Sequence, residues 1–152
     1  MGDITANISF LYYLAKAAAA AVGGYLTTVN TKAENSILTN EFYAAFGNKA
    51  LWIGANDIAT EATWVWDNGT TSGDDNLTDT ICNAPSDNCQ PSLAQWADST
   101  YKWCRKAESD CGANEPNNAG AGGEDCANIT NSSGFWNDLR CSRDQYGIIE
   151  FD

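Results

Sequence analysis

Residues 115–141 constrain this chain most, because they hold two cysteines and many oxygen-bearing side chains in one short stretch. Six of these side chains are candidate metal ligands, namely Glu115, Asn117, Glu124, Asp125, Asn137 and Asp138. The chain has no histidine, so a zinc or copper site would have no imidazole to use. Hard oxygen ligands without nitrogen or thiolate favour Ca²⁺. The stretch therefore predicts a calcium site, and with it a function that depends on calcium.

Length and composition indicate one globular domain over residues 1–152. A chain of 152 residues can bury a sizeable core, and 43% of its residues are hydrophobic. It carries 20 acidic against 8 basic residues, a net charge of -12. This balance argues against binding nucleic acid or an anionic membrane surface, since little basic charge is present to neutralise phosphates. No uninterrupted apolar run reaches the roughly 18 residues that a membrane span needs, so no membrane insertion is expected.

Three short motifs follow one another in the second half of the chain: EPN at 115–117, GGEDC at 122–126 and WND at 136–138. Their order and spacing resemble those of the C-type lectin domain family. Upstream, WIGA at 52–55 resembles a core strand of the family, and WVW at 64–66 resembles the strand after it. The resemblance implies an α+β fold, the C-type lectin fold. In it, two helices flank small antiparallel sheets, and a long loop region binds calcium.

Six cysteines between positions 82 and 141 suggest an oxidising compartment, and so a secreted or cell-surface protein. Cys82 with Cys89 and Cys104 with Cys111 are each seven residues apart, which suits small local loops. A crossed arrangement, Cys82 with Cys111 and Cys89 with Cys104, remains open from the sequence.

The resemblance implies a further disulfide between Cys126 and Cys141. The family's other bridge joins the first helix to the last strand, and both of its cysteines are replaced here. Ala19 stands at the helix position and Ile149 at the strand position. Because both replacements are apolar, packing of Ala19 against Ile149 is expected to take the place of the cross-link, which would otherwise restrict the unfolded chain.

Local patterns predict two helices. The alanine-rich run at 8–22 reads as a helix with Ser9 as its N-cap, ended by Gly23 and Gly24, rather than as a signal peptide. Thr31 and Glu34 resemble a capping box that opens a second helix over residues 33–46.

Strands are expected at residues 25–29, 49–54, 63–66, 126–129, 135–137 and 146–151. The tryptophans at 52, 64, 66 and 136 are interpreted as core residues. Residues 67–114 are interpreted as an expanded loop or insertion, rich in turn formers over 67–100. Of the two tryptophans there, Trp103 rather than Trp96 is taken as the family's loop tryptophan.

The resemblance assigns a principal Ca²⁺ to Glu115, Asn117, Glu124, Asn137 and Asp138. Glu115, Asn117, Glu124 and Asn137 would also hydrogen-bond two vicinal sugar hydroxyls that complete the coordination. Within the family, EPN implies mannose-type sugars: mannose, glucose, GlcNAc and fucose. It also implies a cis peptide bond before Pro116.

A second, auxiliary ion is implied in the same way, which makes the cofactor one or two Ca²⁺ ions. Its ligands would be Asp57, Glu61, Asn118, Glu124 and Asp125. Asn118 stands where an aspartate is commoner in the family, so this site would hold one negative charge fewer. The ion would order the long loop rather than touch sugar.

Three classes of function follow from these features. The first is calcium-dependent binding of glycans. Several copies of the domain, joined by oligomerisation or repeated in a larger parent protein, would supply the avidity that one copy lacks. The second is a C-type-lectin-like module that binds protein or ice while calcium is only structural. The third, an enzyme, is disfavoured because the chain without histidine has no Ser/His/Asp or Cys/His set.

Overall fold

The computed structural model describes residues 9–61, 64–68, 103–104, 106–107 and 110–151. The predicted Cys82–Cys89 pair, Trp96 and most of the 67–114 insertion lie outside these residues. Within the described part, no helix is long and apolar enough to cross a membrane.

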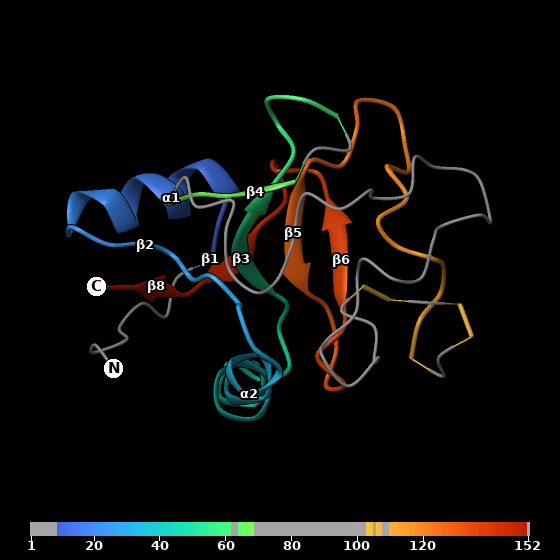
Figure 1. Cartoon of the computed structure of the whole chain (residues 1–152), viewed down its shortest axis with the longest axis horizontal. Coiled ribbons are helices and arrows are strands. Elements are labelled where there is room, and N and C mark those ends of the chain that lie inside the picture. Colours follow the sequence, from blue (N-terminus) through green and yellow to red (C-terminus); the bar gives the residue numbers. More distant parts are fainter. Residues whose placement is uncertain (1–8, 62–63, 69–102, 105, 108–109, 152) are drawn as a thin grey trace.

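A six-stranded sheet forms the centre of the described part (Figure 1), with β1, β7, β3, β5 and β6 side by side and β4 paired to β3. Its strands are β1 Ser9–Phe10, β3 Leu51–Asn56, β4 Val65–Trp66, β5 Cys126–Ile129, β6 Trp136–Leu139 and β7 Gln145–Gly147. A second, two-stranded sheet pairs β2 (Tyr25–Leu26) with β8 (Ile149–Glu150). β3 is buried along its whole length and runs antiparallel to β4 and β5 but parallel to β7.

The first helix, α1 (Tyr12–Ala21), ends where the sequence predicts. Gly23 has a left-handed φ of 81°, and its N–H donates to the Ala20 carbonyl. The predicted N-cap at Ser9 is wrong, because Ser9 lies in β1 opposite Tyr146 of β7. That pairing keeps the backbone extended through Phe10, so the helix begins only after Leu11, which caps it without a side-chain hydrogen bond.

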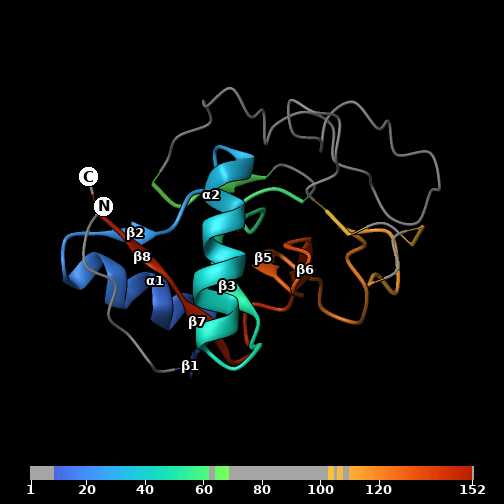
Figure 2. The same ribbon diagram turned by 90° about the horizontal axis from the view of Figure 1, so that it is seen from below.

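The predicted capping box is present at the start of the second helix. Thr31 Oγ1 accepts from the Glu34 N–H at 3.2 Å, and the Glu34 carboxylate accepts from the Thr31 N–H at 3.1 Å. α2 (Lys32–Ile37) continues directly into the π-helical segment η1 (Leu38–Tyr43). Figure 2 shows this second helix lengthwise, and Figure 1 shows it end-on, apart from α1.

Most predicted strands are present with shifted ends, and 126–129 agrees with β5 at both ends. The predicted strand at 146–151 divides into β7 and β8, because the chain leaves β3 and pairs with β2 instead. The predicted strand at 25–29 stops its ladder at Leu26. Beyond it, the Thr27 N–H still donates to the Ile148 carbonyl at 2.9 Å, and the Thr28 N–H donates to the Glu150 carboxylate at 2.9 Å, so a side chain takes over one residue later.

Aromatic side chains fill the core, and the four tryptophans predicted to be buried are at most 2% exposed. Trp103 joins them: it forms a β-bridge with Trp136 and lies edge-on to Trp64, with ring centroids 4.7 Å apart. Trp66 meets Trp136 edge-on as well, at 5.9 Å. Offset and edge-on aromatic pairs add to the free energy of burying such large apolar surfaces.

The structure joins Cys104 to Cys111 and Cys126 to Cys141, the two pairs predicted for these residues. At the position of the missing third bridge, Ala19 is fully buried and Ile149 is partly buried. Both lie next to Gly24. Its N–H donates to the Ala19 carbonyl, and a Cβ added to it would come within 2.8 Å of Ile149 Cγ2. Direct packing of Ala19 on Ile149 stays a prediction.

A buried polar network ties α1 to the sheet. The Tyr12 hydroxyl donates to Asp67 Oδ2 at 3.0 Å, Lys16 Nζ donates to Oδ1 at 2.7 Å, and Asn56 Nδ2 donates to Oδ1 at 2.9 Å. The Asp67 side chain is fully buried, and that burial raises its pKa although Lys16 opposes the shift. Three donors therefore compensate a buried carboxylate.

Replacing Tyr12 with Phe should lower the free energy of unfolding by about 1–3 kcal/mol, because it removes one donor to the buried Asp67 carboxylate. The ring, which meets Trp52 edge-on at 5.4 Å, is retained. Urea denaturation would measure the change. The matched control is Tyr13→Phe, at a side chain that is 53% exposed. Equal losses in the two variants would show that the network does not stabilise the fold.

Candidate functional site

The carboxylate of Asp138 holds the 115–125 loop against β6. Asp138 is 1% exposed, and both of its carboxylate oxygens accept from the Asn117 N–H at 3.0 Å. The Asn118 N–H donates to Oδ2 at 2.6 Å. The ladder between β5 and β6 fixes Asp138 opposite Ala127, so the loop is positioned by the sheet itself. The loop lies beside the ends of β5 and β6 in Figure 1.

Two buried oxygens of the EPN triplet lack a hydrogen-bond donor. Glu115 is 6% exposed, its N–H donates to the Cys104 carbonyl at 2.8 Å, and the bond to Pro116 is cis, as predicted. Within the described residues, no donor contacts Glu115 Oε2 or Asn117 Oδ1. Buried acceptors without donors are costly, and a cation is one group that would satisfy both. Hard oxygens of this kind fit Ca²⁺.

The electrostatics of the site also fit a cation. Burial, followed by the hydrogen bond and the negative charge of Asp138 and the charge of Glu124, raises the pKa of Glu115 to about 8. Burial and then the charge of Asp138 raise the pKa of Glu124, while the Ala119 N–H, Arg140 and Arg143 lower it. Carboxylates that repel one another in a desolvated place are stabilised by a positive ion between them.

The other two principal candidates are directed elsewhere. The Glu124 carboxylate accepts from the Ala119 N–H at 2.9 Å, and the Asn137 side-chain amide donates to the Asp138 carbonyl. In the part of the chain that the structure describes, no three Asp, Glu or Cys side chains converge to hold an ion by themselves. The structure therefore gathers Glu115, Asn117 and Asp138, and an ion there would need amide oxygens in addition to carboxylates.

The candidates for the auxiliary ion are only partly gathered. Asp57 is 3% exposed, and its N–H donates to the Asp125 carbonyl at 3.1 Å, which joins the loop after β3 to the 115–125 loop. A Cβ on Gly123, whose φ is 78°, would come within 3.0 Å of Asp125 Oδ1 and 3.3 Å of Asn118 Oδ1. Asn118 Oδ1 also accepts from the Glu124 N–H at 2.7 Å. Glu61 is exposed.

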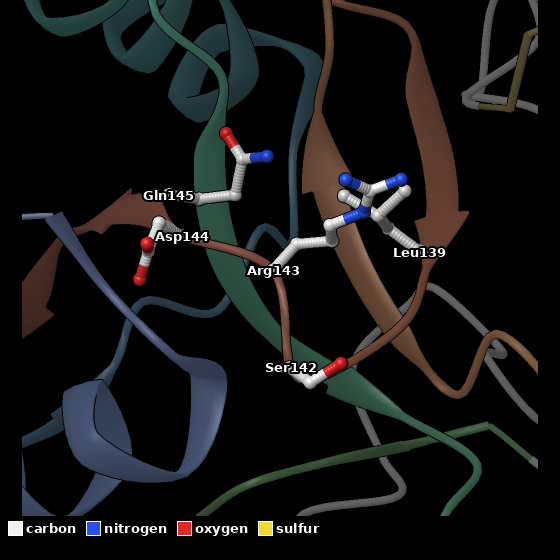
Figure 3. A pocket seen from close by; sticks show the side chains of 5 residues that line it. All are labelled: Leu139, Ser142, Arg143, Asp144 and Gln145. Atoms are coloured by element: carbon white, nitrogen blue, oxygen red, sulfur yellow. The ribbon is translucent and has the colours of Figure 1, made fainter.

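A surface hollow of about 490 Å³ lies on the turn between β6 and β7 (Figure 3), and none of the predicted calcium or sugar ligands lines it. It is lined by Leu139, Ser142, Arg143, Asp144 and Gln145. None of the predicted motifs points to this hollow. The available signal was the presence of two arginines, Arg140 and Arg143, within four residues of a chain with only 8 basic residues.

Without a bound cation, the protein should become less stable as the pH rises from 4.5 to about 8. A carboxyl group with a raised folded pKa stabilises the fold below its unfolded pKa, and this contribution is lost as the pH rises through the folded value. Glu115→Gln should lose less stability than the wild type over this pH range, because glutamine does not ionise. Thermal melting in EDTA at several pH values would measure it, with the exposed Glu41→Gln as control. Parallel melting profiles for all three proteins would contradict the prediction.

The chain resembles known proteins over most of its length. Residues 12–150 match the family model of the Lectin C-type domain. Lectin BRA-3 of Megabalanus rosa is 40% identical over 47 residues, which are 31% of this chain and 26% of that lectin. The matched segment is thus a small part of that relative.

Two solved structures share the fold at low sequence identity. One is the C-type carbohydrate-recognition domain of cow CD23, determined in the presence of GlcNAc2Man3 oligosaccharide, with 22% identity and a TM-score of 0.57. The other is a calcium-independent type II antifreeze protein, with 17% identity and a TM-score of 0.58. In each case the match covers 93% of this chain and 78% of the other. The family model over residues 12–150 and the shared fold place the chain in the C-type lectin domain family.

Proposed function

We propose that this chain binds mannose-type sugars through Ca²⁺ at the EPN loop. The proposal starts from a family of carbohydrate-binding domains that are not enzymes. The observation that carries it is the pair of buried oxygens, Glu115 Oε2 and Asn117 Oδ1, which no donor in the described residues satisfies. They lie beside the buried carboxylate of Asp138, and all three belong to the motifs that the family uses.

The chemistry of the side chains explains how such a site selects a hydroxyl pair. Glu115, Asn117, Glu124, Asn137 and Asp138 would hold the principal ion. Bound Ca²⁺ accepts more oxygens than these side chains supply, so sugar hydroxyls can complete its coordination. A glutamate only accepts hydrogen bonds, whereas an asparagine can turn its oxygen to the ion and donate through nitrogen. The order of Glu115 and Asn117 therefore decides which hydroxyl geometry is satisfied.

We propose Asp57, Glu61, Asn118, Glu124 and Asp125 for an auxiliary ion that orders the loops. The backbone hydrogen bond from Asp57 to Asp125 supports this, since it already joins the two loops concerned. Glu61, which is exposed, would join the other ligands when this ion binds. The role of the auxiliary ion would be to hold the 115–125 loop ready for sugar.

The relatives support glycans as partners. Lectin BRA-3 is named for carbohydrate binding, and the CD23 domain was studied with a mannose-containing oligosaccharide. An extracellular or cell-surface location fits the described disulfides, Cys104–Cys111 and Cys126–Cys141. Because one sugar in an open site binds weakly, several copies of the domain would supply avidity.

A second candidate function is binding of ice or protein, with calcium absent or only structural. The likeness to the calcium-independent type II antifreeze protein favours it, since that structure shares the fold at a TM-score of 0.58. The insertion at 67–114 offers residues that such a partner could contact. This alternative differs from the first in one measurable respect, because such a module would not bind mannose through calcium at the EPN loop.

The chain should be retained on immobilised mannose in calcium buffer and eluted by EDTA. The double variant Glu115→Gln/Asn117→Asp should lose mannose binding and gain galactose binding, because it exchanges the acceptor and donor positions of the triplet. Column retention on both sugars would measure the change. The matched control is Asn40→Asp/Glu41→Gln, which makes the same chemical changes at exposed residues of η1.

Retention of the wild type that EDTA does not reverse would contradict a calcium lectin. Absence of retention would favour the second candidate if calcium still raised the melting temperature. A double variant that behaved like the Asn40/Glu41 control would place sugar binding somewhere other than the EPN loop.

A further inference from the structure

The turn that joins β6 to β7 is held rigidly and carries two arginines. The Arg143 N–H donates to the Arg140 carbonyl at 2.9 Å, which closes a β-turn. Inside the turn, Cys141 is bonded to Cys126 of β5, and its carbonyl accepts from the Tyr12 N–H at 3.0 Å. A covalent bond and two hydrogen bonds thus fix the backbone from which both guanidinium groups extend.

Arg140 reaches the loop that carries the candidate sugar site. A Cβ added to Gly120 would come within 2.5 Å of Arg140 Nη2, so the guanidinium lies against the loop at a residue without a side chain. Gly120 also has a left-handed φ of 98°, which disfavours other residues there.

Arg143 faces the hollow of about 490 Å³, together with the hydroxyl of Ser142 and the amide of Gln145. The carboxylate of Asp144 points away from the Arg143 guanidinium in Figure 3. Among the residues that the structure describes, neither Arg140 nor Arg143 lies within 4.0 Å of a carboxylate in an ion pair. Both arginines are exposed, so their guanidinium groups remain open to a ligand.

We propose that this turn is an anion subsite, and that the ligand of the chain is an acidic saccharide. In a chain of net charge -12, an acidic glycan would be repelled almost everywhere except at such a cationic place. The planar guanidinium forks match the oxygens of a carboxylate or a sulfate, and Ser142 and Gln145 add neutral donors. The inference rests on the proposed function: the loop would hold the hydroxyl pair while the turn holds the acidic substituent.

Titration calorimetry of the whole chain in calcium buffer at low ionic strength would test the subsite. The probes are methyl α-mannoside, mannuronic acid and mannose 6-sulfate, which compare a neutral sugar with a carboxylate and a sulfate. The acidic sugars should bind about tenfold more tightly than the neutral one, because charge-assisted hydrogen bonds are the strong ones. Whichever of the two acidic probes binds more tightly identifies the anion.

Arg143→Gln and Arg140→Gln should each reduce the preference for the acidic sugar several-fold. Arg143→Gln, which changes a side chain on the hollow, should leave the affinity for methyl α-mannoside unchanged. The matched control is Lys49→Gln, which removes the same charge at an exposed residue just before β3, near the end of that strand remote from Asp57. Equal preference for acidic and neutral sugars, or a loss as large in Lys49→Gln, would overturn the anion subsite. Failure of methyl α-mannoside to bind in calcium would instead overturn the proposed function.

Discussion

The buried carboxylate of Asp138 is the contact on which the candidate site depends. It is buried although it lies on β6, the strand at one edge of the sheet, and it accepts hydrogen bonds from the backbone N–H groups of Asn117 and Asn118. A loop has little apolar surface with which to hold itself on a domain, so hydrogen bonds to a desolvated charge take that role. The sheet thereby fixes the position of the loop backbone. The cost is a negative charge in a place of low polarity, next to other negative charges.

That cost explains why the site is suited to a cation. Glu115 is buried beside Asp138, and the pKa of Glu115 rises to about 8 because both burial and charge oppose its ionisation. The fold thus brings together groups that disfavour one another unless something positive joins them. The same chain compensates another buried carboxylate, Asp67, with donors from its own side chains, among them Lys16. Asp67 therefore finds its hydrogen-bond donors within the fold, whereas the carboxylates of the candidate site would be stabilised by a bound cation.

Much of the fold was predictable because its signals are local. The capping box of Thr31 and Glu34 and the glycine that ends α1 act within a few residues, and both were predicted correctly. The strand at 126–129 was predictable for the same reason. The prediction of Ser9 as a helix N-cap was wrong, because Ser9 pairs with Tyr146. Tyr146 is far away in sequence, and no local pattern predicts that pairing. The division of the last strand into β7 and β8 likewise depends on two different neighbouring strands.

The sequence by itself determined the kinds of groups in the candidate site: oxygen ligands, no imidazole, and a cysteine at each end of the 126–141 segment. Only the tertiary structure decided which of those oxygens lack a donor. Glu115 Oε2 and Asn117 Oδ1 are left over because the sheet holds Asp138 against the loop backbone, whereas Glu124 is turned to a backbone N–H. The close approach of the Arg140 guanidinium to Gly120 could not be predicted from the sequence either. Burial and hydrogen-bond satisfaction are properties of the packed chain, since they depend on residues that come together only on folding.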